Sequence, residues 1–475
     1  MNRTNAATKK SNTTDASRMQ AFFEQRQKDQ KGILEAVLCT IHHFFGDFNS
    51  LFSGVCDPRN PNKTTYSIAG LGFTGVMMYL CHLEARRQIR LLMHNEAAIE
   101  TFRTLFGVQG IPHGDTLNDA FCSVAPEQVQ DVVCETIRRL VRSKVLYPYR
   151  VLNKYYVVAI DGTGMVTYSS RHCPHCLTKK MRNGKTLYYH NVLEAKLVTP
   201  NGFAFSLMTQ FIENPAKNPS KQDCELKAFY RLAPRLKAAF PRLPILLVMD
   251  GLFAGGPVFK LCDKNDWKFM IVLTDDDLRS VNEEFEALSS LQLGNHLTVV
   301  TGNNREIRQA FRWVNEISYT DSNSEEHIID CIECIETTSD EKGVETHTRW
   351  KWTTNCRVTD RNVIALANDA GRNRWKIENE GFNTQKNGGY GLEHAYTADP
   401  NSAKVFYYLM QIAHMISQLL YKGSLLGKDG RKRLGSLKNL AFYILEAWRN
   451  AWLGKPAIEA LHARSIQIRF CPDTS

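Results

Sequence analysis

The chain has 475 residues, 43% hydrophobic and 23% charged, with a formal charge of +10, which is typical of a globular protein of two to four domains and compatible with a polyanionic partner. The longest apolar stretch, residues 68–81, is shorter than the ~20 residues that a membrane-spanning helix needs, and the first residues lack the apolar region of a signal peptide. The thirteen scattered cysteines are more typical of reduced thiols than of disulfides, so we expect a soluble, cytoplasmic protein without a membrane partner.

The first 150 residues are predicted to be mostly helical. Residues 1–30 are polar and basic, which is typical of a disordered tail. Within residues 31–150, apolar residues recur at helical spacing, as in Ile33, Val37 and Ile41, and short loops separate the predicted helices. We therefore expect a helical N-terminal domain over residues 31–150.

A strand-rich pattern follows in residues 151–279. The predicted strands are residues 155–160, 188–198, 203–212, 245–249 and 268–273. Helices are predicted before and after the fourth of these strands. Three hairpin strands followed by α/β crossovers predict a mixed sheet with helices on both faces, which is the order of elements in a ribonuclease-H-like core.

The remaining residues divide into three predicted segments. Alternation of apolar and polar residues returns between 280 and 360, which predicts a β-rich insertion. Helical spacing resumes from about residue 368, and we assign residues 361–400 to a second part of the core. Residues 401–475 are predicted to form a C-terminal helical region.

Two aspartates stand at equivalent places in the predicted sheet. Asp161 and Asp250 each follow an apolar strand directly and begin a glycine-containing turn. Ligand sites of α/β sheets gather at the carboxyl ends of strands, and carboxylate oxygens suit Mg²⁺ or Mn²⁺. Asp-Gly is also an ordinary turn dipeptide, but two of them at the ends of two buried strands favour a site.

A third acid is expected on the helix that begins near residue 372. Arg374 and Glu378 are four residues apart and share one face of this helix, whereas Glu380 points elsewhere. Taken alone, this spacing is more typical of a surface ion pair between Arg374 and Glu378 than of a site.

These segments together resemble the DDE transposases of bacterial insertion sequences, of the insertion-sequence-four type with a Y-R-E-K signature. The matching segments are AIDGTGM, LLVMDGLFAGGPVF and RNRWKIENEGFNTQKNGGYGLEH, and the pieces YYHNVLEAKLV and KQDCELKAFYRL between them also match. The resemblance extends over roughly residues 155 to 420. It implies a ribonuclease-H-like core that a β-rich domain interrupts before the last acid.

The resemblance also assigns roles. Asp161 and Asp250 take the two aspartate positions and Glu378 the glutamate position, so that the three would hold two Mg²⁺ or Mn²⁺ ions. Arg374 takes the signature arginine position, and Lys386 lies one residue after the signature lysine position; both would contact DNA phosphates. The signature tyrosine would fall at a glycine, so that role is unfilled.

The implied function is that of a transposase that cleaves the ends of an insertion sequence and joins them to target DNA by two-metal phosphoryl transfer. Its partners would be double-stranded DNA, as element terminal repeats and as target, and further copies of the chain in the synaptic complex. Residues 31–150 would bind the terminal repeats, and the protein would lie with the nucleoid in a bacterial cytoplasm. Two alternatives of the same fold are a DNA-binding relative without catalysis and a stand-alone nuclease that cuts without joining.

Two further patterns have two interpretations each. Cys173 and Cys176 form a Cys-x-x-Cys pair, typical of a zinc knuckle or of a loop with reduced thiols. The remaining ligands of a zinc site would come from His172, His175, His190 or the pair Cys331 and Cys334. Tryptophans 313, 350 and 352 lie beside basic residues, which is typical of base-stacking positions or of packed sheet positions.

Overall fold

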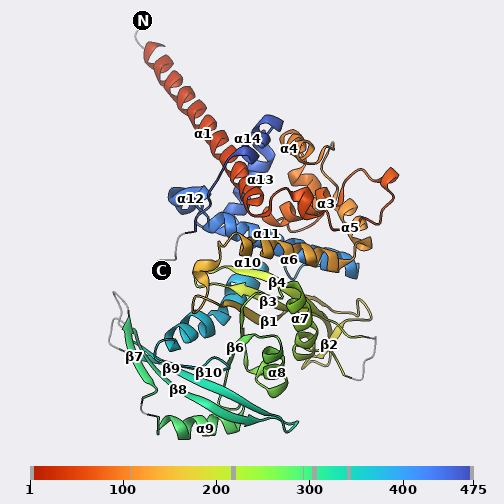
Figure 1. The fold of residues 1–475 in the computed structure, drawn as a ribbon. Coiled ribbons are helices and arrows are strands. Elements are labelled where there is room, and N and C mark those ends of the chain that lie inside the picture. Colours follow the sequence, from red (N-terminus) through yellow and green to blue (C-terminus); the bar gives the residue numbers. More distant parts are fainter. Residues whose placement is uncertain are drawn as a thin grey trace. The chain divides into compact units, whose positions relative to one another are not determined.

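The computed structural model describes residues 5–108, 110–215, 221–292, 294–301, 307–339 and 344–470 (Figure 1). It is a mixed α/β protein that divides into two compact units. The helical unit consists of Met1–Arg139 and Gln385–Pro472, and the sheet unit of Leu140–Thr384 and Asp473–Ser475. No helix among the described residues has the length and apolar character needed to cross a membrane.

Segments from both ends of the chain build the helical unit. Its helices are α1 (Asn5–Phe45), α2 (Phe48–Leu51), α3 (Ile68–Leu80), α4 (Glu96–Phe106), α5 (Gly114–Ser123), α6 (Pro126–Arg142), α11 (Pro400–Lys422), α12 (Gly427–Leu434), α13 (Leu437–Asn450) and α14 (Lys455–Ala463). The shorter elements are η1 (Pro61–Lys63), η2 (Ile89–Met93) and η8 (Ser424–Leu426). The boundaries between the units fall within α6, after Arg139, and within α10 (Thr384–Asn387), after Thr384.

Residues that the sequence analysis assigned to separate N-terminal and C-terminal regions pack together in the helical unit, because α3 needs cover on every side. All residues of α3 from Ala69 to Leu80 are buried. The C-terminal helix α11 packs on it so closely that a β-carbon at Gly75 would lie 2.6 Å from Leu409 Cδ1. A helix that is apolar all round cannot be stable in water on its own, so the two ends of the chain form one core.

Helix α1 takes the place of most of the tail expected over residues 1–30. It runs from Asn5 to Phe45, and residues 1–4 lie outside the described residues. Side-chain hydrogen bonds four residues apart, from Gln20 to Glu24 and from Gln25 to Asp29, support its polar part. This part has no apolar stripe, which is why helical spacing becomes visible only from about Ile33.

The sheet unit contains ten strands in one sheet, which confirms the predicted mixed α/β class. The strands are β1 (Tyr156–Tyr168), β2 (Leu177–Lys180), β3 (Thr186–Val198), β4 (Ala204–Ile212), β5 (Ile245–Met249), β6 (Lys268–Val272), β7 (His296–Thr301), β8 (Ile307–Thr320), β9 (Glu326–Ser339) and β10 (Glu345–Thr354). The helices and turns are η3 (Tyr147–Tyr149), α7 (Glu225–Ala239), η4 (Gly251–Phe253), α8 (Gly256–Lys264), α9 (Arg279–Ser289), η5 (Ala365–Ala370), η6 (Gly371–Arg374) and η7 (Ile377–Asn383).

The strand order is β2-β3-β1-β5-β6-β10-β9-β8-β7, and β4 also pairs with β3. β1, β5 and β6 are parallel neighbours, whereas β1 with β3 and β3 with β4 are antiparallel. β10 pairs with the free edge of β6, so β7–β10 extend the same sheet instead of forming a separate body (Figure 1). An unpaired edge strand exposes its N–H and C=O groups, and β10 covers that edge.

The segment from η5 to η7 covers one face of the sheet. Its buried residues Leu366, Ala370 and Ile377 join the core that Val157, Leu246 and other strand residues form. The main segment of the sheet unit runs from Leu140 to Thr384. The sequence analysis placed the start of the core at residue 151 and its end at residue 400. This cover positions the helix that carries Arg374 and Glu378.

Candidate active site

Asp161 and Asp250 lie on neighbouring parallel strands. β1 pairs with β5 from Tyr156, opposite Ile245, to Ala159, opposite Val248. Continuing this register by two residues places Asp161 beside Asp250. The convergence that the sequence predicted for these aspartates is therefore present at one edge of the parallel part of the sheet.

The strand that carries Asp161 is longer than predicted. β1 continues to Tyr168 because β3 pairs with it as far as Tyr188, with Asp161 opposite Glu194. Asp161 thus lies within a long strand, at the point where its parallel neighbour β5 has ended. The strand pattern alone marked this point correctly as the end of the buried apolar run.

A local N–H group orients each aspartate. Asp161 Oδ1 accepts a hydrogen bond from the N–H of Gly162 at 2.9 Å. Asp250 caps the short turn η4, since its Oδ1 accepts from the N–H of Leu252 at 3.1 Å. These bonds favour the ionised carboxylates and hold them in fixed orientations.

The helical segment after residue 370 brings the third acid to this edge. Arg374 Nη1 lies 2.8 Å from Glu378 Oε1 and 3.7 Å from Asp161 Oδ2, so one guanidinium links both acids. Arg374 is only 7% exposed, which argues against the surface ion pair considered from the sequence. Glu380 pairs with Lys376 instead, at 3.7 Å.

Gly371 packs closely against another side chain at the position where the resemblance would place the signature tyrosine. Gly371 stands there, and a β-carbon on it would lie 2.7 Å from the Trp352 ring. The indole of Trp352 is buried against the backbone of η6, where a side chain at position 371 would have to be. The φ of Gly371 is −53°, which any residue can adopt, so the backbone conformation does not require glycine here. The close approach of the Trp352 ring does.

Burial, together with repulsion from neighbouring acids, raises the pKa of both aspartates. Burial raises the pKa of Asp161 to about 7; Arg374 opposes the rise, and Glu378 and Asp250 add to it. Burial also raises the pKa of Asp250, against the effect of the Leu252 N–H group and Arg374. A cation bound between these carboxylates would relieve the repulsion.

Two further acids lie at this edge, and the sequence reasoning missed both. Glu225, the first residue of α7, lies against Gly162, where a β-carbon would be 2.2 Å from its Oε1. Burial, and then repulsion from Asp250, raise the pKa of Glu225. Because successive residues of a strand point to opposite faces, α7 approaches β1 from the face opposite η7. The predicted helices on both faces of the sheet are therefore present.

Asp277 is the second missed acid. It follows β6, the next parallel strand, and a β-carbon on Gly251 would lie 2.5 Å from its Oδ2. The same oxygen accepts hydrogen bonds from the N–H and the hydroxyl of Thr274, both at 2.8 Å. The only sequence signal for Asp277 was its position shortly after an apolar strand. Asp275 and Asp276 have the same position, so the sequence could not single out Asp277.

Lys386 belongs to the helical unit and has its own partner there. Its Nζ lies 2.8 Å from Glu393 Oε1. The neighbouring Gln385, at the signature lysine position, is fully buried and bonded to Gln411 at 2.8 Å and to His414 at 3.0 Å. Gln385 therefore has a packing role in this chain.

The basic residues beside the tryptophans of the sheet are paired inside the protein. Trp313 and Trp352 are 2% and 1% exposed, which fits packed sheet positions and not base stacking. The neighbouring guanidinium groups of Arg312 and Arg349 both bind the fully buried Glu333, the latter at 2.5 Å.

The thiol pairs differ in their surroundings. Cys331 and Cys334 lie in the buried centre of β9, opposite Thr353 and Trp350 of β10. Cys173 and Cys176 lie in the loop between β1 and β2, where their sulfurs approach His190 of β3.

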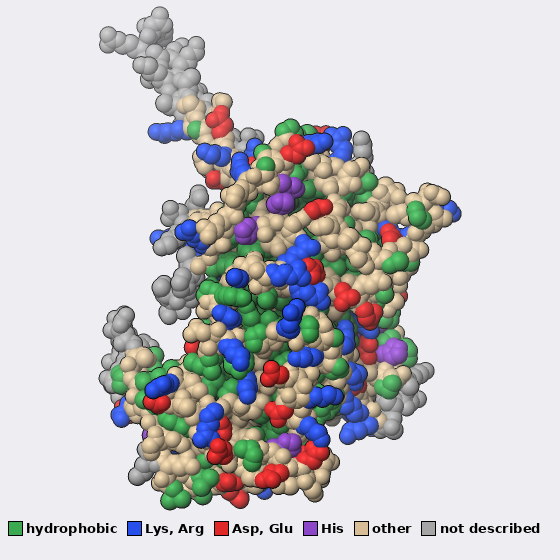
Figure 2. Space-filling model, in the orientation of Figure 1, with side chains coloured by type: hydrophobic (Ala, Val, Ile, Leu, Met, Phe, Trp, Pro, Cys, Tyr) green, Lys and Arg blue, Asp and Glu red, His purple; other side chains and the backbone are tan. Residues whose placement is uncertain are grey.

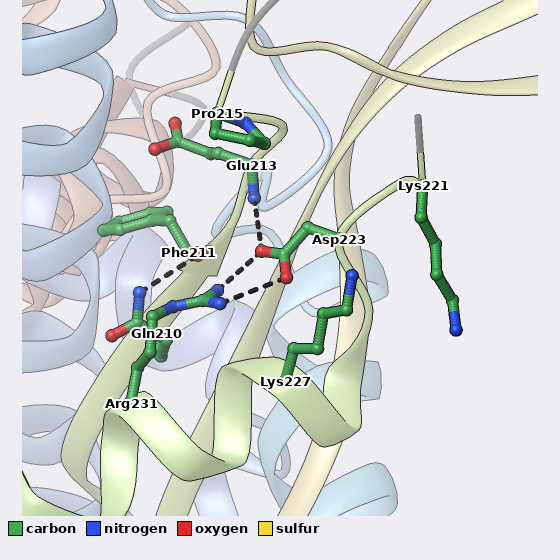
Figure 3. A pocket seen from close by; sticks show the side chains of 8 residues that line it. All are labelled: Gln210, Phe211, Glu213, Pro215, Lys221, Asp223, Lys227 and Arg231. Carbon is green, nitrogen blue, oxygen red and sulfur yellow. Dashed lines mark hydrogen bonds and ion pairs between the residues drawn. The ribbon is translucent and has the colours of Figure 1, made fainter. Parts of the chain in front are cut away.

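A pocket of about 360 Å³ lies beside the start of α7 (Figure 3). Its lining residues come from the end of β4, the segment after it and α7: Gln210, Phe211, Glu213, Pro215, Lys221, Asp223, Lys227 and Arg231. Arg231 points toward Asp223 and pairs with it at 2.5 Å and 3.1 Å (Figure 3). Its charge is thus largely neutralised, and Asp161, Asp250 and Glu378 do not line this pocket.

Comparison with family models and with curated proteins finds no match to this chain. Inferences about its function therefore depend on the geometry of the carboxylates and on the motifs that carry the resemblance.

Proposed function

We propose that this chain is a DNA transposase that cleaves and joins DNA by metal-dependent phosphoryl transfer. The observation that carries the proposal is the convergence of Asp161, Asp250 and Glu378 around Arg374, although more than two hundred residues separate the first acid from the last. Repulsion between acids of like charge at one place opposes folding unless cations offset it, so this convergence favours a metal site.

The strand order supports a ribonuclease-H-like core. Three antiparallel strands, β4, β3 and β1, continue into the parallel strands β5 and β6. In such a sheet, ligands bind beyond the carboxyl ends of the parallel strands, and Asp250 and Asp277 follow two such ends. This is the arrangement that the resemblance implies.

The side chains present fit a divalent metal site. All the acids at this edge offer hard oxygen ligands, as Mg²⁺ and Mn²⁺ prefer, and burial removes competing water. Asp161, Asp250 and Glu378 would hold two ions. When bound, such ions activate the attacking oxygen and stabilise the leaving oxygen at phosphorus.

Arg374 has a positioning role in this proposal. Its guanidinium holds Glu378 at 2.8 Å and contacts Asp161 at 3.7 Å, so it sets the distance between the first and last acids. A side chain that is 7% exposed and doubly paired suits this role better than the direct phosphate contact implied by the resemblance. Lys386, which is partly exposed and paired with an exposed glutamate, fits phosphate contact better.

DNA is the proposed substrate because the chain is basic and its motifs resemble those of transposases. The formal charge is +10, and Lys and Arg side chains recur across the face of the molecule shown in Figure 2, with acidic ones among them. Element terminal repeats and target DNA would both bind, and joining two ends requires association of at least two chains.

The experiment is a cleavage and strand-transfer assay with full-length protein. Duplexes carrying the DNA that flanks this reading frame are incubated with a labelled target plasmid and Mg²⁺ or Mn²⁺. Asp161→Asn, Asp250→Asn and Glu378→Gln should each lower cleavage by at least a hundredfold, about 2.7 kcal/mol of transition-state stabilisation.

Glu380→Gln is the matched control, since Glu380 lies two residues from Glu378 but pairs with Lys376. It should cleave like the unmodified chain. Cleavage that survives Glu378→Gln would overturn the site, and cleavage without joining would identify a nuclease of the same fold.

A further inference from the structure

A second cluster of ligand side chains lies outside the carboxylate site, between β1 and β3. Cys173 and Cys176 belong to the loop that follows β1, and His190 belongs to β3. The two sulfurs are 3.6 Å apart, and each lies 3.4 Å from His190 Nε2. Three donor atoms from two segments, the loop and β3, thus form a nearly equilateral triangle.

The edges of this triangle match those of a tetrahedral zinc site. With Zn–S of about 2.3 Å and Zn–N of about 2.0–2.1 Å, tetrahedral geometry requires roughly 3.8 Å between two sulfurs and roughly 3.6 Å between sulfur and nitrogen. The observed distances of 3.6 Å and 3.4 Å are each about 0.2 Å shorter than these. A disulfide, in contrast, would bring the sulfurs to about 2.05 Å and leave the histidine contact unexplained.

Hydrogen bonding between thiols and imidazole explains less of this arrangement. Nε2 of a neutral imidazole either donates one proton or accepts one hydrogen bond, yet both sulfurs approach it equally. Two sulfurs and one imidazole nitrogen are the ligands that zinc selects, whereas Mg²⁺ and Mn²⁺ prefer oxygen. The cluster is therefore chemically distinct from the carboxylate site.

The loop is held in the conformation that presents both sulfurs. Asn214 donates its side-chain N–H to Cys176 O at 2.8 Å and its backbone N–H to His175 O at 3.0 Å. The carbonyl of Asn214 lies 2.8 Å from His175 Nδ1. The N–H of Cys173 points at Cys176 Sγ at 3.4 Å, a bond that a thiolate accepts well.

We propose that Cys173, Cys176 and His190 bind one Zn²⁺ ion. Among the described residues no fourth Cys, His, Asp or Glu joins this group, so a solvent molecule would complete the tetrahedron. The other candidates have different surroundings: His172 stacks on the Tyr168 ring, His175 is engaged with Asn214, and Cys331 and Cys334 are buried in β9.

The bound ion would fasten the loop to the strand pair that carries Asp161. His190 lies opposite Val166 of β1, and Glu194, four residues later on β3, lies opposite Asp161. The zinc would thus cross-link one end of this strand pair, with a structural role that does not depend on the proposed transposase activity.

The test is the metal content of the full-length protein after equilibration with Zn²⁺ and removal of loosely bound metal. The unmodified chain should retain one zinc per chain, and Cys173→Ser, Cys176→Ser and His190→Ala should lose it. His175→Ala is the matched control, because it removes a histidine of the same loop that is not a ligand; it should keep the zinc. The proposal would be overturned if the unmodified chain retained no zinc. It would also be overturned if His175→Ala lost its zinc while His190→Ala kept it.

Two measurements keep the test decisive if a variant fails to fold. His190→Cys supplies another zinc ligand and should retain the metal that His190→Ala loses. In the unmodified chain, Co²⁺ should produce a thiolate-to-metal charge-transfer band, and zinc should slow alkylation of Cys173 and Cys176 but not of the exposed Cys224. Absence of the band, or alkylation rates that zinc leaves unchanged, would contradict zinc binding.

Discussion

The carboxylate of Glu225 lies directly against the backbone of Gly162, so that a β-carbon at position 162 would fall 2.2 Å from Glu225 Oε1. The glycine is next to Asp161, and Glu225 begins α7 on the other face of the sheet. Glycine is therefore required at this position for space, and the first turn of α7 is packed onto the strand that carries Asp161.

Gly162→Ala should displace Glu225 and destabilise the fold by about 1–3 kcal/mol, since overpacking of a tight contact costs this much. Urea unfolding followed by circular dichroism measures the change. Gly164→Ala is the matched control on the same strand, because its nearest contact would be an ordinary 3.7 Å to Asn191 Oδ1. If the clash with Glu225 is the cause, the double variant Gly162→Ala/Glu225→Ala should regain most of the free energy of unfolding that Gly162→Ala loses.

Metal binding should strengthen between pH 6 and pH 8. Burial raises the pKa of Asp161 to about 7, and a metal ion requires the ionised carboxylate. Roughly a tenth of Asp161 is ionised one pH unit below this pKa, so the affinity for Mg²⁺ at pH 6 should be about tenfold weaker than at pH 8. Calorimetric titration without DNA measures it, and equal affinities at both pH values would contradict the expectation.

The same pKa predicts the opposite trend for the stability of the metal-free protein. The folded-state pKa of Asp161 is raised above the ordinary value of 3.8 for an aspartate, so protonation favours the folded state. This contribution is complete below about pH 3.8 and is lost as the pH rises through about 7. Asp161→Asn should remove this part of the pH dependence of the free energy of unfolding.

Removing Arg374 should move the pH dependence of metal binding upward. Its positive charge opposes the effect of burial on Asp161, so Arg374→Ala should raise the pKa of Asp161 further. Arg374→Lys keeps the charge and should shift the midpoint less. The midpoint is obtained from Mn²⁺ affinities measured across the pH range; a midpoint that stays in place or falls would argue against the contact between Arg374 and Asp161.

Lys196 should be essential for stability because it is a fully buried charge. Its Nζ lies 3.4 Å from Glu194 Oε2, both side chains are inaccessible, and Ser206 donates to the same glutamate at 2.6 Å. Lys196→Met removes the positive charge beside the buried Glu194 carboxylate and should cost about 3–5 kcal/mol in urea unfolding. Burial lowers the pKa of Lys196, against the attraction of Glu194.

The control for Lys196→Met is the double variant with Glu194→Gln. It removes both charges of the pair, so it should recover part of the lost stability. Lys196 also lies over the Phe382 ring of η7, at 5.6 Å from the ring centre. A loss of stability that is equal in the single and double variants would mean that packing against η7, not the charge pair, is the main contribution.

The sequence by itself determined the local features of the site, namely the strands that end at its aspartates and the helix face that carries its third acid. The apolar runs before Asp161 and Asp250 specify buried strands, and the four-residue spacing of Arg374 and Glu378 specifies a shared helix face. The pairing of β1 with β5 then followed from the order of the elements, so the convergence of the aspartates was predictable. The Cys-x-x-Cys spacing likewise identified half of the proposed zinc site.

Only the tertiary structure decided which distant residues complete these sites. Glu225 reaches Gly162 from the start of α7, and His190 was one of several candidate ligands until the β1–β3 register placed it beside Cys173 and Cys176. The union of α3 with α11 likewise depends on burying a helix that is apolar on all sides. Periodicity within a segment reflects contacts between near neighbours along the chain, whereas these contacts arise from packing between surfaces that many segments form together.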